Sequence, residues 1–434
     1  MKSNRGLPMR NVVRCGLIGF GTVGKGVYQL LQENAHLIKL RTGIDVQIVT
    51  ICDLRTDLVR REVSDIPVTD NWRDLLEDDS IDTIIELIGG IEPAKTMITE
   101  CMKKGKDVVT ANKKLLAEDG DQVFDLANSG SAKLGFEASI GGGIPCVVSL
   151  KSGLVGNRVH TVMGILNGTT NYILTQMYDK AIPFDDALRE AQELGFAEAD
   201  PTFDIEGHDA GHKIALLSMI AYNKKVHFSK VQVQGITRIT LLDIMYAYEM
   251  GYVIKLLGIS RKIGDEFDIR VQPTMLPFKH PLASVRDEFN GIMYDNDMTG
   301  PVTLYGRGAG GLPTASSVVS DIVQMAQKDN IYENAISLEG EINYMAPGKR
   351  KCRYYLRLYS EDKAGILARV AGVLGDYDIS IASVMQQEVE GTYVPIVITT
   401  HGANEEGMMR SISEINKFEF ISGDVVVIPV EDFE

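Results

Sequence analysis

The amino-acid sequence predicts an α/β protein with three parts: a doubly wound domain with a parallel sheet, an α+β domain and a C-terminal ferredoxin-like domain. In the first part, apolar runs alternate with helix-like stretches, as expected for successive βαβ units. A βαββαβ order follows a linker near residue 350. We assign residues 1–145, 146–313 and 352–434 to the three domains, and we expect a segment at about 314–345 to return to the first domain.

Composition limits the classes of partner and the compartment. The 434 residues are 44% hydrophobic and 24% charged, which is enough for buried cores in two or three domains. A formal net charge of −15 disfavours nucleic acid or an anionic membrane surface as a partner, because both would repel the chain on average. No apolar run approaches the roughly 18 residues of a membrane span, and the N-terminus lacks an apolar secretory core. We therefore expect a soluble cytoplasmic protein.

Cysteine usage agrees with that compartment. The cysteines show no C-x-x-C pairing, and an odd, scattered set is typical of a reducing environment. Neither a disulfide framework nor a zinc site is expected. The five residues are Cys15, Cys52, Cys101, Cys146 and Cys352.

The first domain begins with a glycine motif that indicates a dinucleotide site. The apolar run VVRCGLIGFGTVG at 12–24 ends in the pattern G-x-G-x-x-G, and a helical stretch at 22–40 follows directly. A strand, a tight glycine turn and a helix N-terminus together direct backbone N–H groups toward a pyrophosphate. A similar turn without a cofactor is the alternative. The predicted cofactor-binding residues of this turn are Gly19, Phe20, Gly21, Thr22, Val23 and Gly24.

The rest of the first domain continues the alternation. Apolar runs at 46–52, 82–88, 107–110 and 132–136 are separated by helix-like stretches at 93–104 and 115–128. This order predicts a Rossmann-type sheet. We add Gly89, which directly follows the run at 82–88, to the cofactor-binding residues.

Two residues at the end of the second strand bear on coenzyme choice. Asp53 stands where an acid binds the adenosine ribose hydroxyls, although it follows Gly24 by more residues than is usual. Arg55 stands two residues later, where a guanidinium accepts a 2′-phosphate. Asp53 favours NAD and Arg55 favours NADP, so the sequence leaves the choice open.

The segment 191–213 crowds carboxylates around one lysine. Glu198 and Asp204 lie in a stretch broken by Pro and Gly, and Asp209 and Lys213 begin an apolar helix. Side chains at i and i+4 share one helix face, so Asp209 and Lys213 can meet. An ordinary helix start with a weak ion pair is the alternative to a reaction site.

Four segments, in the same order along the chain, resemble homoserine dehydrogenases. They are VVTANKKLL at 108–116, ILNGTTNYIL at 165–174, the acidic segment at 191–213 and GAGGLPTASSVVSD at 308–321. The resemblance implies reversible reduction of aspartate 4-semialdehyde to homoserine with NADP or NAD, in the synthesis of threonine, methionine and isoleucine. An aldehyde that gains hydride at carbon needs a proton at oxygen, and this chain offers lysines for that step.

The resemblance also implies roles for individual residues. Lys213 would donate the proton, Asp209 would orient the lysine or the substrate, and Lys113 would lie near the nicotinamide and the substrate. Lys114 is an equal candidate without the family match. Two ammonium groups in one cleft should lower each other's pKa toward neutrality. The implied substrate-binding residues are Glu198 and, more weakly, Asp204 for the ammonium group, with Gly168 and Thr169 offering backbone amides in a loop that is otherwise an ordinary turn.

A second glycine-rich loop resembles a cation site of the family. In EASIGGGIP at 137–145, Glu137 and the carbonyls of Ile140, Gly142 and Ile144 would surround a sodium ion. A hinge into the second domain is the alternative. The run GRGAGG at 306–311 lacks a P-loop lysine, so we interpret it as a close backbone approach near the cofactor.

The C-terminal part resembles an ACT domain, a small module that binds amino acids. MAPGKRK at 345–351 is a linker, and SEDKAGILARVAGVL resembles the first turn and helix of the module. Strands are expected at 353–359, 378–388, 394–401 and 424–430, and helices at 364–376 and 404–417. The effector loop would include Asp362, Gly365, Ile366 and Leu367, with threonine as the expected effector. A domain that only dimerises is the alternative.

Other functions compete with this interpretation. A semialdehyde dehydrogenase that forms a thioester would need a nucleophilic cysteine, for which Cys146 is the nearest candidate. A non-catalytic sensor of nucleotide and amino acid would leave the acidic segment without a purpose. We expect a homodimer or homotetramer, with strands at 231–240 and 267–273 contributing to a sheet.

Overall fold

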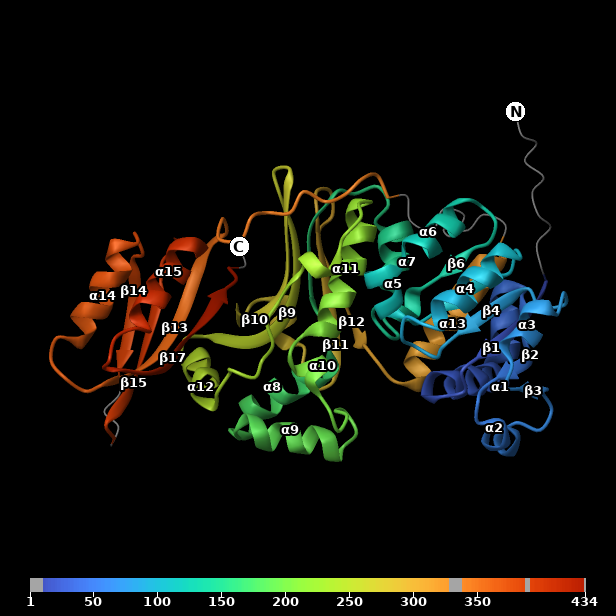
Figure 1. The fold of residues 1–434 in the computed structure, drawn as a ribbon, viewed down its shortest axis with the longest axis horizontal. Coiled ribbons are helices and arrows are strands. Elements are labelled where there is room, and N and C mark those ends of the chain that lie inside the picture. The colour runs from blue at the N-terminus through green and yellow to red at the C-terminus, as the bar shows by residue number, and fades with distance from the viewer. Residues whose placement is uncertain (1–10, 328–337, 387–390, 433–434) are drawn as a thin grey trace.

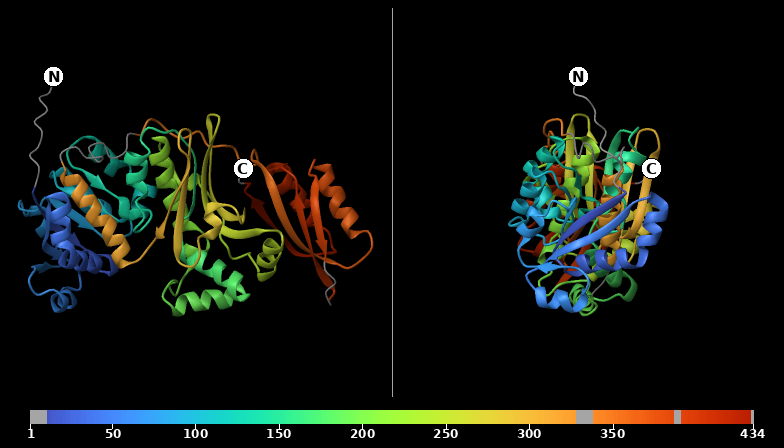
Figure 2. Two further views of the ribbon diagram at one scale, coloured as in Figure 1. Left: turned by 180° about the vertical axis from the view of Figure 1, so that it is seen from behind. Right: turned by 90° about the vertical axis from the view of Figure 1, so that its right-hand side faces the viewer.

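The computed structural model describes residues 11–327, 338–386 and 391–432, and it shows three parts in a row (Figure 1). The first domain lies at one end, the second in the middle and the C-terminal domain at the other end, as the left view of Figure 2 also shows. In the part of the chain that is described, none of the helices has the length and apolar character needed to cross a bilayer.

A six-stranded sheet forms the core of the first domain. Its strand order is β3-β2-β1-β4-β5-β6, with every pair parallel, which is the doubly wound order that the sequence predicts. The strands are mostly apolar because both faces of the sheet are covered by helices. Their bounds are β1 Val12–Ile18, β2 Asp45–Cys52, β3 Val68–Thr69, β4 Thr83–Glu86, β5 Asp107–Thr110 and β6 Leu134–Gly135.

Helices cover the two faces of this sheet with separate apolar clusters. Helices α1 and α13 pack side by side on one face, and α4 and α6 pack on the other. Helix α13 comes from the far side of the second domain in sequence, so the region at 311–326 lies with the first domain in space. The bounds are α1 Thr22–Thr42, α2 Thr56–Glu62, α3 Trp72–Glu77, α4 Ala94–Lys103, α5 Lys113–Asp119, α6 Asp121–Asn128 and α13 Gly311–Ala326.

Two predicted features of this region differ in the structure. The single helix expected at 115–128 is two helices, α5 and α6, because Gly120 ends the first and begins the second. The segment expected to return to the first domain does so only through α13, because Glu341 and Tyr344 form parallel bridges with Lys225 and Phe267 of the second domain. Residues 328–337 of this segment lie outside the described residues.

The second domain is an antiparallel sheet with helices packed on it. The sheet has the order β12-β11-β7-β9-β10, and α8 and α11 pack against its central strands. The bounds are α7 Cys146–Val148, β7 Val159–Ile165, α8 Gly168–Lys180, α9 Phe184–Glu193, α10 Thr202–Ile205, α11 His208–Tyr222, β8 Gln232–Val233, α12 Leu241–Glu249, β9 Tyr252–Ile263, β10 Glu266–Pro277, β11 Phe289–Asn296 and β12 Gly300–Arg307.

The strand expected at 231–240 is wrong for most of its length. Only β8, Gln232–Val233, pairs with the sheet. At Gly235 the backbone lies against that of Ile205 and Glu206, and Ile236 N–H donates to Ile205 O at 2.8 Å. These contacts take the chain away from the sheet edge and into the capping box at Thr240 that begins α12.

The C-terminal domain has the predicted βαββαβ order and the strand order β17-β13-β15-β14. Helices α14 and α15 pack against each other and against the sheet. One parallel bridge, Met275 to Val430, joins this sheet to that of the second domain. The bounds are β13 Lys351–Glu361, α14 Ile366–Asp376, β14 Ile381–Gln386, β15 Tyr393–Thr400, β16 Ala403–Asn404, α15 Glu405–Ile415 and β17 Ile421–Val430; the end of the strand expected at 378–388 lies partly outside the described residues.

Candidate active site

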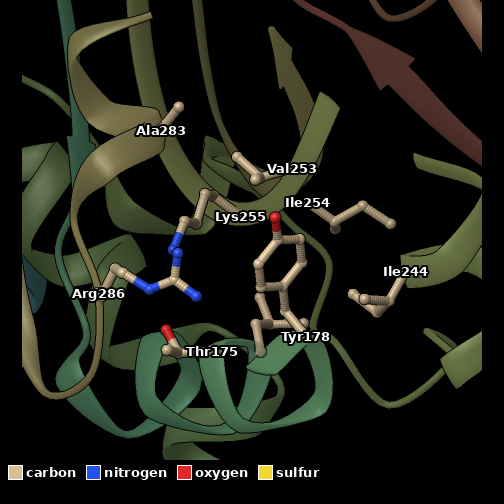
Figure 3. Close-up of a pocket in the computed structure, with 9 residues that line it drawn as sticks. Thr175, Tyr178, Ile244, Val253, Ile254, Lys255, Ala283 and Arg286 are labelled. Atoms are coloured by element: carbon tan, nitrogen blue, oxygen red, sulfur yellow. The ribbon is translucent and has the colours of Figure 1, made fainter. Parts of the chain in front are cut away.

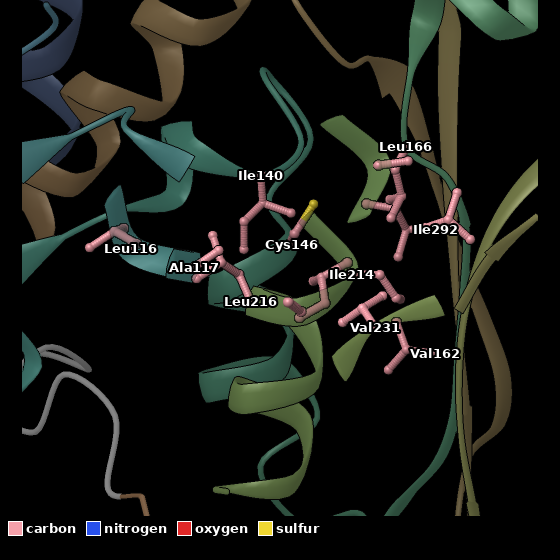
Figure 4. Packing of buried hydrophobic residues seen from close by; sticks show 14 of the residues in the cluster. Leu116, Ala117, Ile140, Cys146, Val162, Leu166, Ile214, Leu216, Val231 and Ile292 are labelled. Atoms are coloured by element: carbon pink, nitrogen blue, oxygen red, sulfur yellow. The ribbon is translucent and has the colours of Figure 1, made fainter. Parts of the chain in front are cut away.

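The candidate site lies where the first and second domains meet. Helix α5 of the first domain packs against α11 of the second, and apolar side chains of both belong to one buried cluster (Figure 4). Because α5 follows the carboxyl end of β5, the start of α5 lies at the sheet edge where doubly wound proteins bind their ligands. The labelled residues from these two helices are Leu116, Ala117, Ile214 and Leu216.

Asp209 holds two lysines at this interface. Its Oδ1 lies 2.7 Å from Lys113 Nζ, and its Oδ2 lies 2.7 Å from Lys213 Nζ. Lys213 Nζ also donates to Leu166 O at 2.7 Å. The Lys213 side chain is 8% exposed, whereas that of Lys113 is 33% exposed. A carboxylate therefore bridges one buried and one accessible ammonium group.

The two lysines differ in pKa. Burial lowers the pKa of Lys213, although Asp209 opposes this effect. Asp209 raises the pKa of Lys113, although burial opposes it. The expectation that both values would fall is wrong for Lys113, because the carboxylate lies between the two charges. Burial alone would raise the pKa of Asp209, but Lys213 and Lys113 together hold it below its ordinary value.

Asn167 organises the acids of the site, and the sequence analysis assigned it no role. Its Nδ2 donates to Asp204 Oδ1 at 2.7 Å and to Asp209 Oδ2 at 2.9 Å. Its Oδ1 caps α8 by accepting from Thr170 N–H at 2.9 Å. The residue is the first asparagine of the LNGTTN motif, which was the available signal. One amide side chain thus fixes two carboxylates and the start of α8.

Asp204 and Thr169 lie in the same network. Thr169 Oγ1 lies 2.6 Å from Phe196 O and 3.2 Å from Asp204 Oδ2, so its single hydroxyl hydrogen can be donated to either acceptor. Burial raises the pKa of Asp204, and the nearby charge of Asp209 adds to this effect. Gly168 is the first residue of α8, so its N–H and that of Thr169 belong to the positive end of a helix.

Glu198 and Lys114 lie in more open surroundings. Glu198 is exposed, and its charge contributes to the raised pKa of Lys113. Lys114 is exposed, whereas Lys113 contacts Asp209, so the geometry favours Lys113 of the two.

The glycine motif forms the predicted tight turn between β1 and α1. A Cβ atom on Gly24 would lie 2.2 Å from Gly19 O, so the turn requires glycine there. Phe20 N–H donates to Asp53 Oδ2 at 2.8 Å, which joins this turn to the end of β2. Gly21 precedes α1 as its N-cap residue, and Thr22 and Val23 begin the helix.

Asp53 and Arg55 form an ion pair beside the turn. Arg55 Nε lies 3.0 Å from Asp53 Oδ1, and Arg55 Nη2 lies 3.0 Å from Asp53 Oδ2. These hydrogen bonds from Arg55 lower the pKa of Asp53 to about 2. The Arg55 side chain is 59% exposed, so its charge remains accessible to a ligand.

Glu86 is a second residue that the sequence analysis missed. It is fully buried at the end of β4, and its Oε1 accepts from Ile88 N–H at 2.8 Å and Gly89 N–H at 3.2 Å. Its Oε2 accepts from Thr110 Oγ1 at 2.6 Å. Glu86 thus shapes the loop that contains Gly89, and an acid within the apolar run at 82–88 was its signal.

The loop after β6 is tied to both neighbouring domains. Glu137 is buried, and its two carboxylate oxygens accept from Val147 N–H and Val148 N–H, each at 2.8 Å. Burial raises the pKa of Glu137 to about 7. Gly142 O accepts from Ser317 Oγ at 2.6 Å.

The last part of this loop is closed by a cysteine. Ile144 O accepts from Cys146 N–H at 2.8 Å and from Cys146 Sγ at 3.1 Å. Burial raises the pKa of the Cys146 thiol well above its ordinary value, so a thiolate is disfavoured there. Ile140 is buried beside Cys146 in the cluster of Figure 4.

A second buried lysine lies away from this interface. Lys255 of β9 lines a cavity of about 20 Å³ with Tyr178 of α8 and Arg286 (Figure 3). Its Nζ donates to Asn171 Oδ1 at 2.8 Å and Val285 O at 2.6 Å. Burial, with a smaller contribution from Arg286, lowers its pKa to about 7. It joins α8 to the segment before β11.

The predicted effector loop lies in the C-terminal domain at the start of α14. Gly365 has φ of 88° and precedes the helix, so the helix begins at Ile366 rather than at 364. Asp362 and Leu367 are exposed, whereas the Ile366 side chain is buried. An open cleft of about 600 Å³ borders this loop, and Arg369 on its wall stacks over Phe418.

Comparison with known proteins identifies the family. A sequence profile described as homoserine dehydrogenase matches residues 145–323, and one described as its NAD-binding domain matches residues 19–137. An ACT domain profile matches residues 354–417. The chain belongs to the homoserine dehydrogenase family. It is thus an oxidoreductase with a nucleotide-binding domain and a C-terminal ACT domain.

Relatives cover nearly the whole chain. A homoserine dehydrogenase of Neisseria gonorrhoeae is 38% identical over 436 residues, which cover 96% of this chain and 98% of that protein. The homoserine dehydrogenase of Bacillus subtilis is 36% identical over 417 residues, covering 94% of this chain and 96% of that protein. These alignments include all three domains of the family.

Solved homoserine dehydrogenase structures share this fold. The crystal structure from Thiobacillus denitrificans has a TM-score of 0.91 and 38% identity, and it covers 97% of this chain and 98% of its own. A hyperthermophilic archaeal homoserine dehydrogenase in complex with NADPH has a TM-score of 0.63 and 26% identity, over 74% of this chain and 99% of its own.

Proposed function

We propose that this enzyme interconverts aspartate 4-semialdehyde and homoserine, with Lys213 as the group that donates the proton. The observation that carries this proposal is the carboxylate of Asp209, which holds Lys113 and Lys213 at the meeting point of the two domains. A lysine with a lowered pKa is a better acid near neutral pH than an ordinary lysine.

Lys213, assisted by Asp209 and Lys113, carries out the proton transfer of the reaction. When bound, a nicotinamide cofactor would supply the hydride for the aldehyde carbon and would accept it in the reverse direction. As charge develops on the aldehyde oxygen, the Lys213 ammonium donates one proton to it and becomes a neutral amine. The backbone carbonyl of Leu166 and the carboxylate of Asp209 keep that ammonium group oriented. Lys113 remains charged and stabilises negative charge in the same place.

The substrate's own charges match the remaining groups. Asp204 and Glu198 would hold its ammonium group. The N–H groups of Gly168 and Thr169 at the start of α8 would hold its carboxylate. The network around Asn167 supports this arrangement because it fixes Asp204 relative to the start of α8.

The cofactor would bind at the glycine turn and across the ends of the parallel strands. Residues 19–24 would face the pyrophosphate, with Gly89 nearby. The ion pair of Asp53 and Arg55 supports use of either NADP or NAD, since the carboxylate suits ribose hydroxyls and the exposed guanidinium suits a 2′-phosphate.

We propose that a monovalent cation binds in the loop after β6. Glu137 is a buried carboxylate whose pKa is raised to about 7, and a neighbouring cation would favour its charged form. Glu137 and the carbonyls of Ile140, Gly142 and Ile144 would supply oxygen ligands, which suit sodium. Such an ion would stabilise the junction of the two domains.

Regulation would act through the ACT domain. Gly365 and Ile366 line a cleft large enough for an amino acid, and Asp362 and Leu367 lie in the same loop. We propose threonine as the effector and an oligomer, either a dimer or a tetramer, as the working form.

Turnover of purified variants tests the proposal. Aspartate 4-semialdehyde reduction is followed with NADPH and with NADH, with and without threonine. Lys213→Ala should lower kcat by roughly 100- to 10,000-fold, the contribution of a general acid. Lys114→Ala is the matched control and should stay within about twofold. A folded Lys213→Ala variant with wild-type turnover would reject Lys213 as the acid.

A further inference from the structure

Three contacts between acidic and basic side chains cross the interface between the first two domains. The contact nearest the candidate site joins α5 to α11, the next joins the same helices one turn further, and the outermost joins α6 to the segment after α11. From the site outward they are Lys113 with Asp209, Glu118 with His212, and Asp121 with Lys225.

The middle contact joins a buried imidazole to a partly exposed carboxylate. His212 Nε2 lies 2.6 Å from Glu118 Oε1, and His212 is 1% exposed. In the tautomer that carries its proton on Nε2, His212 donates to this carboxylate oxygen. Nδ1 is buried and has no hydrogen-bond partner among the described residues. The rings of Phe228, 4.1 Å away, and Phe203, 5.5 Å away, confine the imidazole.

This contact lies close to both lysines along their helices. His212 directly precedes Lys213 on α11, and Glu118 is five residues after Lys113 on α5. An open cleft of about 400 Å³ between the domains reaches Glu118, whose side chain is 29% exposed. Solvent thus reaches Glu118, whereas His212, its hydrogen-bond partner, is buried inside the interface.

We propose that His212 and Glu118 are a positioning pair that holds α5 against α11 and thereby keeps Lys113 within reach of Asp209. This inference rests on the function proposed above for Lys113, Asp209 and Lys213. Asp209 and Lys213 share one helix, so their contact does not depend on the interface. The Lys113 contact does, because Lys113 comes from the other domain.

The consequence of losing the pair follows from this asymmetry. Without the bond, Lys113 moves relative to the substrate while Lys213 stays in place. A small misplacement of a catalytic group costs up to about 100-fold in rate. The glycine turn that would bind the cofactor lies elsewhere in the domain, so coenzyme affinity should be preserved.

Paired variants test the proposal by kinetics. His212→Phe and Glu118→Ala delete the bond, and each should lower kcat roughly tenfold. His212→Gln and Glu118→Gln can keep the hydrogen bond, and each should restore kcat to within about threefold. The double deletion should be no slower than either single one, because both remove the same bond. Asp121→Asn, which breaks the exposed outer contact, is the control and should match the wild type.

Labelling of Lys113 provides a readout that does not need turnover. Acylation of lysines with an amine-reactive reagent, mapped by mass spectrometry, should become severalfold faster at Lys113 in both deletion variants and stay unchanged at Lys114. The proposal would be overturned if Glu118→Ala had the kcat of the wild type and its Lys113 were labelled at the wild-type rate. It would also be overturned if His212→Phe lowered kcat and Glu118→Ala did not. A wild-type enzyme without turnover would instead reject the proposed function, and the labelling result would still decide the role of the pair.

Discussion

At the scale of single residues, the site depends on how neighbours change the chemistry of ordinary side chains. Lys113 and Lys213 are the same residue type and contact the same carboxylate, yet their pKa values shift in opposite directions. Burial has the larger effect on the pKa of Lys213 and lowers it, whereas the charge of Asp209 has the larger effect on the pKa of Lys113 and raises it. A lysine's environment, rather than its presence in a motif, therefore assigns its role.

Arg55 allows a prediction about coenzyme choice at this scale. If its guanidinium accepts a 2′-phosphate, Arg55→Ala should weaken NADPH binding roughly tenfold while leaving NADH binding nearly unchanged, since a hydrogen bond to a charged group is lost. Dissociation constants from nucleotide fluorescence measure both effects. Arg60→Ala on α2 is the control. An equal loss for both coenzymes would show that Arg55 stabilises the turn instead.

At the scale of elements, the LNGTTN motif positions helix α8 through several hydrogen bonds. Asn167 caps α8 and binds two acids of the site. Asn171 Nδ2 donates to Asp287 O at 2.9 Å and to Phe289 O at 3.0 Å, while its Oδ1 accepts from Lys255. The motif is thus mainly a device for placing α8, whose N-terminus faces the site.

Lys255 makes the stability of this element depend on pH. Its pKa is about 7 in the folded protein and about 10.4 in an unfolded chain, so between these values the unfolded state binds more protons. The free energy of unfolding should therefore decrease as pH falls from about 10 to about 7, by up to ~1.4 kcal/mol per pH unit, and change no further below pH 7.

Lys255→Met removes this dependence. In urea unfolding at pH 7, 8 and 9, the free energy of unfolding of the wild type relative to that of the variant should increase with pH. Lys262→Met, which changes an exposed lysine of the same strand, should follow the wild type at each pH. A difference between Lys255→Met and wild type that is constant across this range would contradict the lowered pKa.

At the scale of the whole molecule, a buried ion pair connects the C-terminal domain to the second domain. Asp243 at the start of α12 has no exposed surface, and it accepts from Arg357 Nε at 2.7 Å and from Tyr355 Oη at 2.9 Å. Both partners come from β13. Since α12 packs on α8, this contact lies between the ACT domain and the helix that begins at the candidate site.

Asp243→Asn should therefore loosen the C-terminal domain. Removing one partner of a buried pair leaves the other charge uncompensated and costs ~3–5 kcal/mol. The expected results are a lower unfolding midpoint and faster proteolysis in the linker at 345–350. Asp424→Asn, which breaks the exposed Arg238–Asp424 contact between the same two domains, should change neither. Equal behaviour of the two variants would show that the sheet junction alone holds the domains together.

The sequence by itself determined what depends on local chain order. The alternation of strands and helices, the glycine turn, the i,i+4 placement of Asp209 and Lys213 and the βαββαβ order are all set by neighbours in the chain, because period and turn chemistry are local properties. The break at Gly120 and the loss of the strand after Val233 escaped prediction. The latter depends on contact with Ile205, far away in sequence.

Only the tertiary structure decided which distant groups meet and what their surroundings do to them. Asn167 reaches Asp204 and Asp209, Glu118 reaches His212, and Asp243 reaches Arg357 across separations that no local pattern encodes. Folding alone brings these groups together. Burial then raises the pKa of Asp204 and lowers that of Lys213, because the cost of charge depends on the surrounding medium and not on chain order.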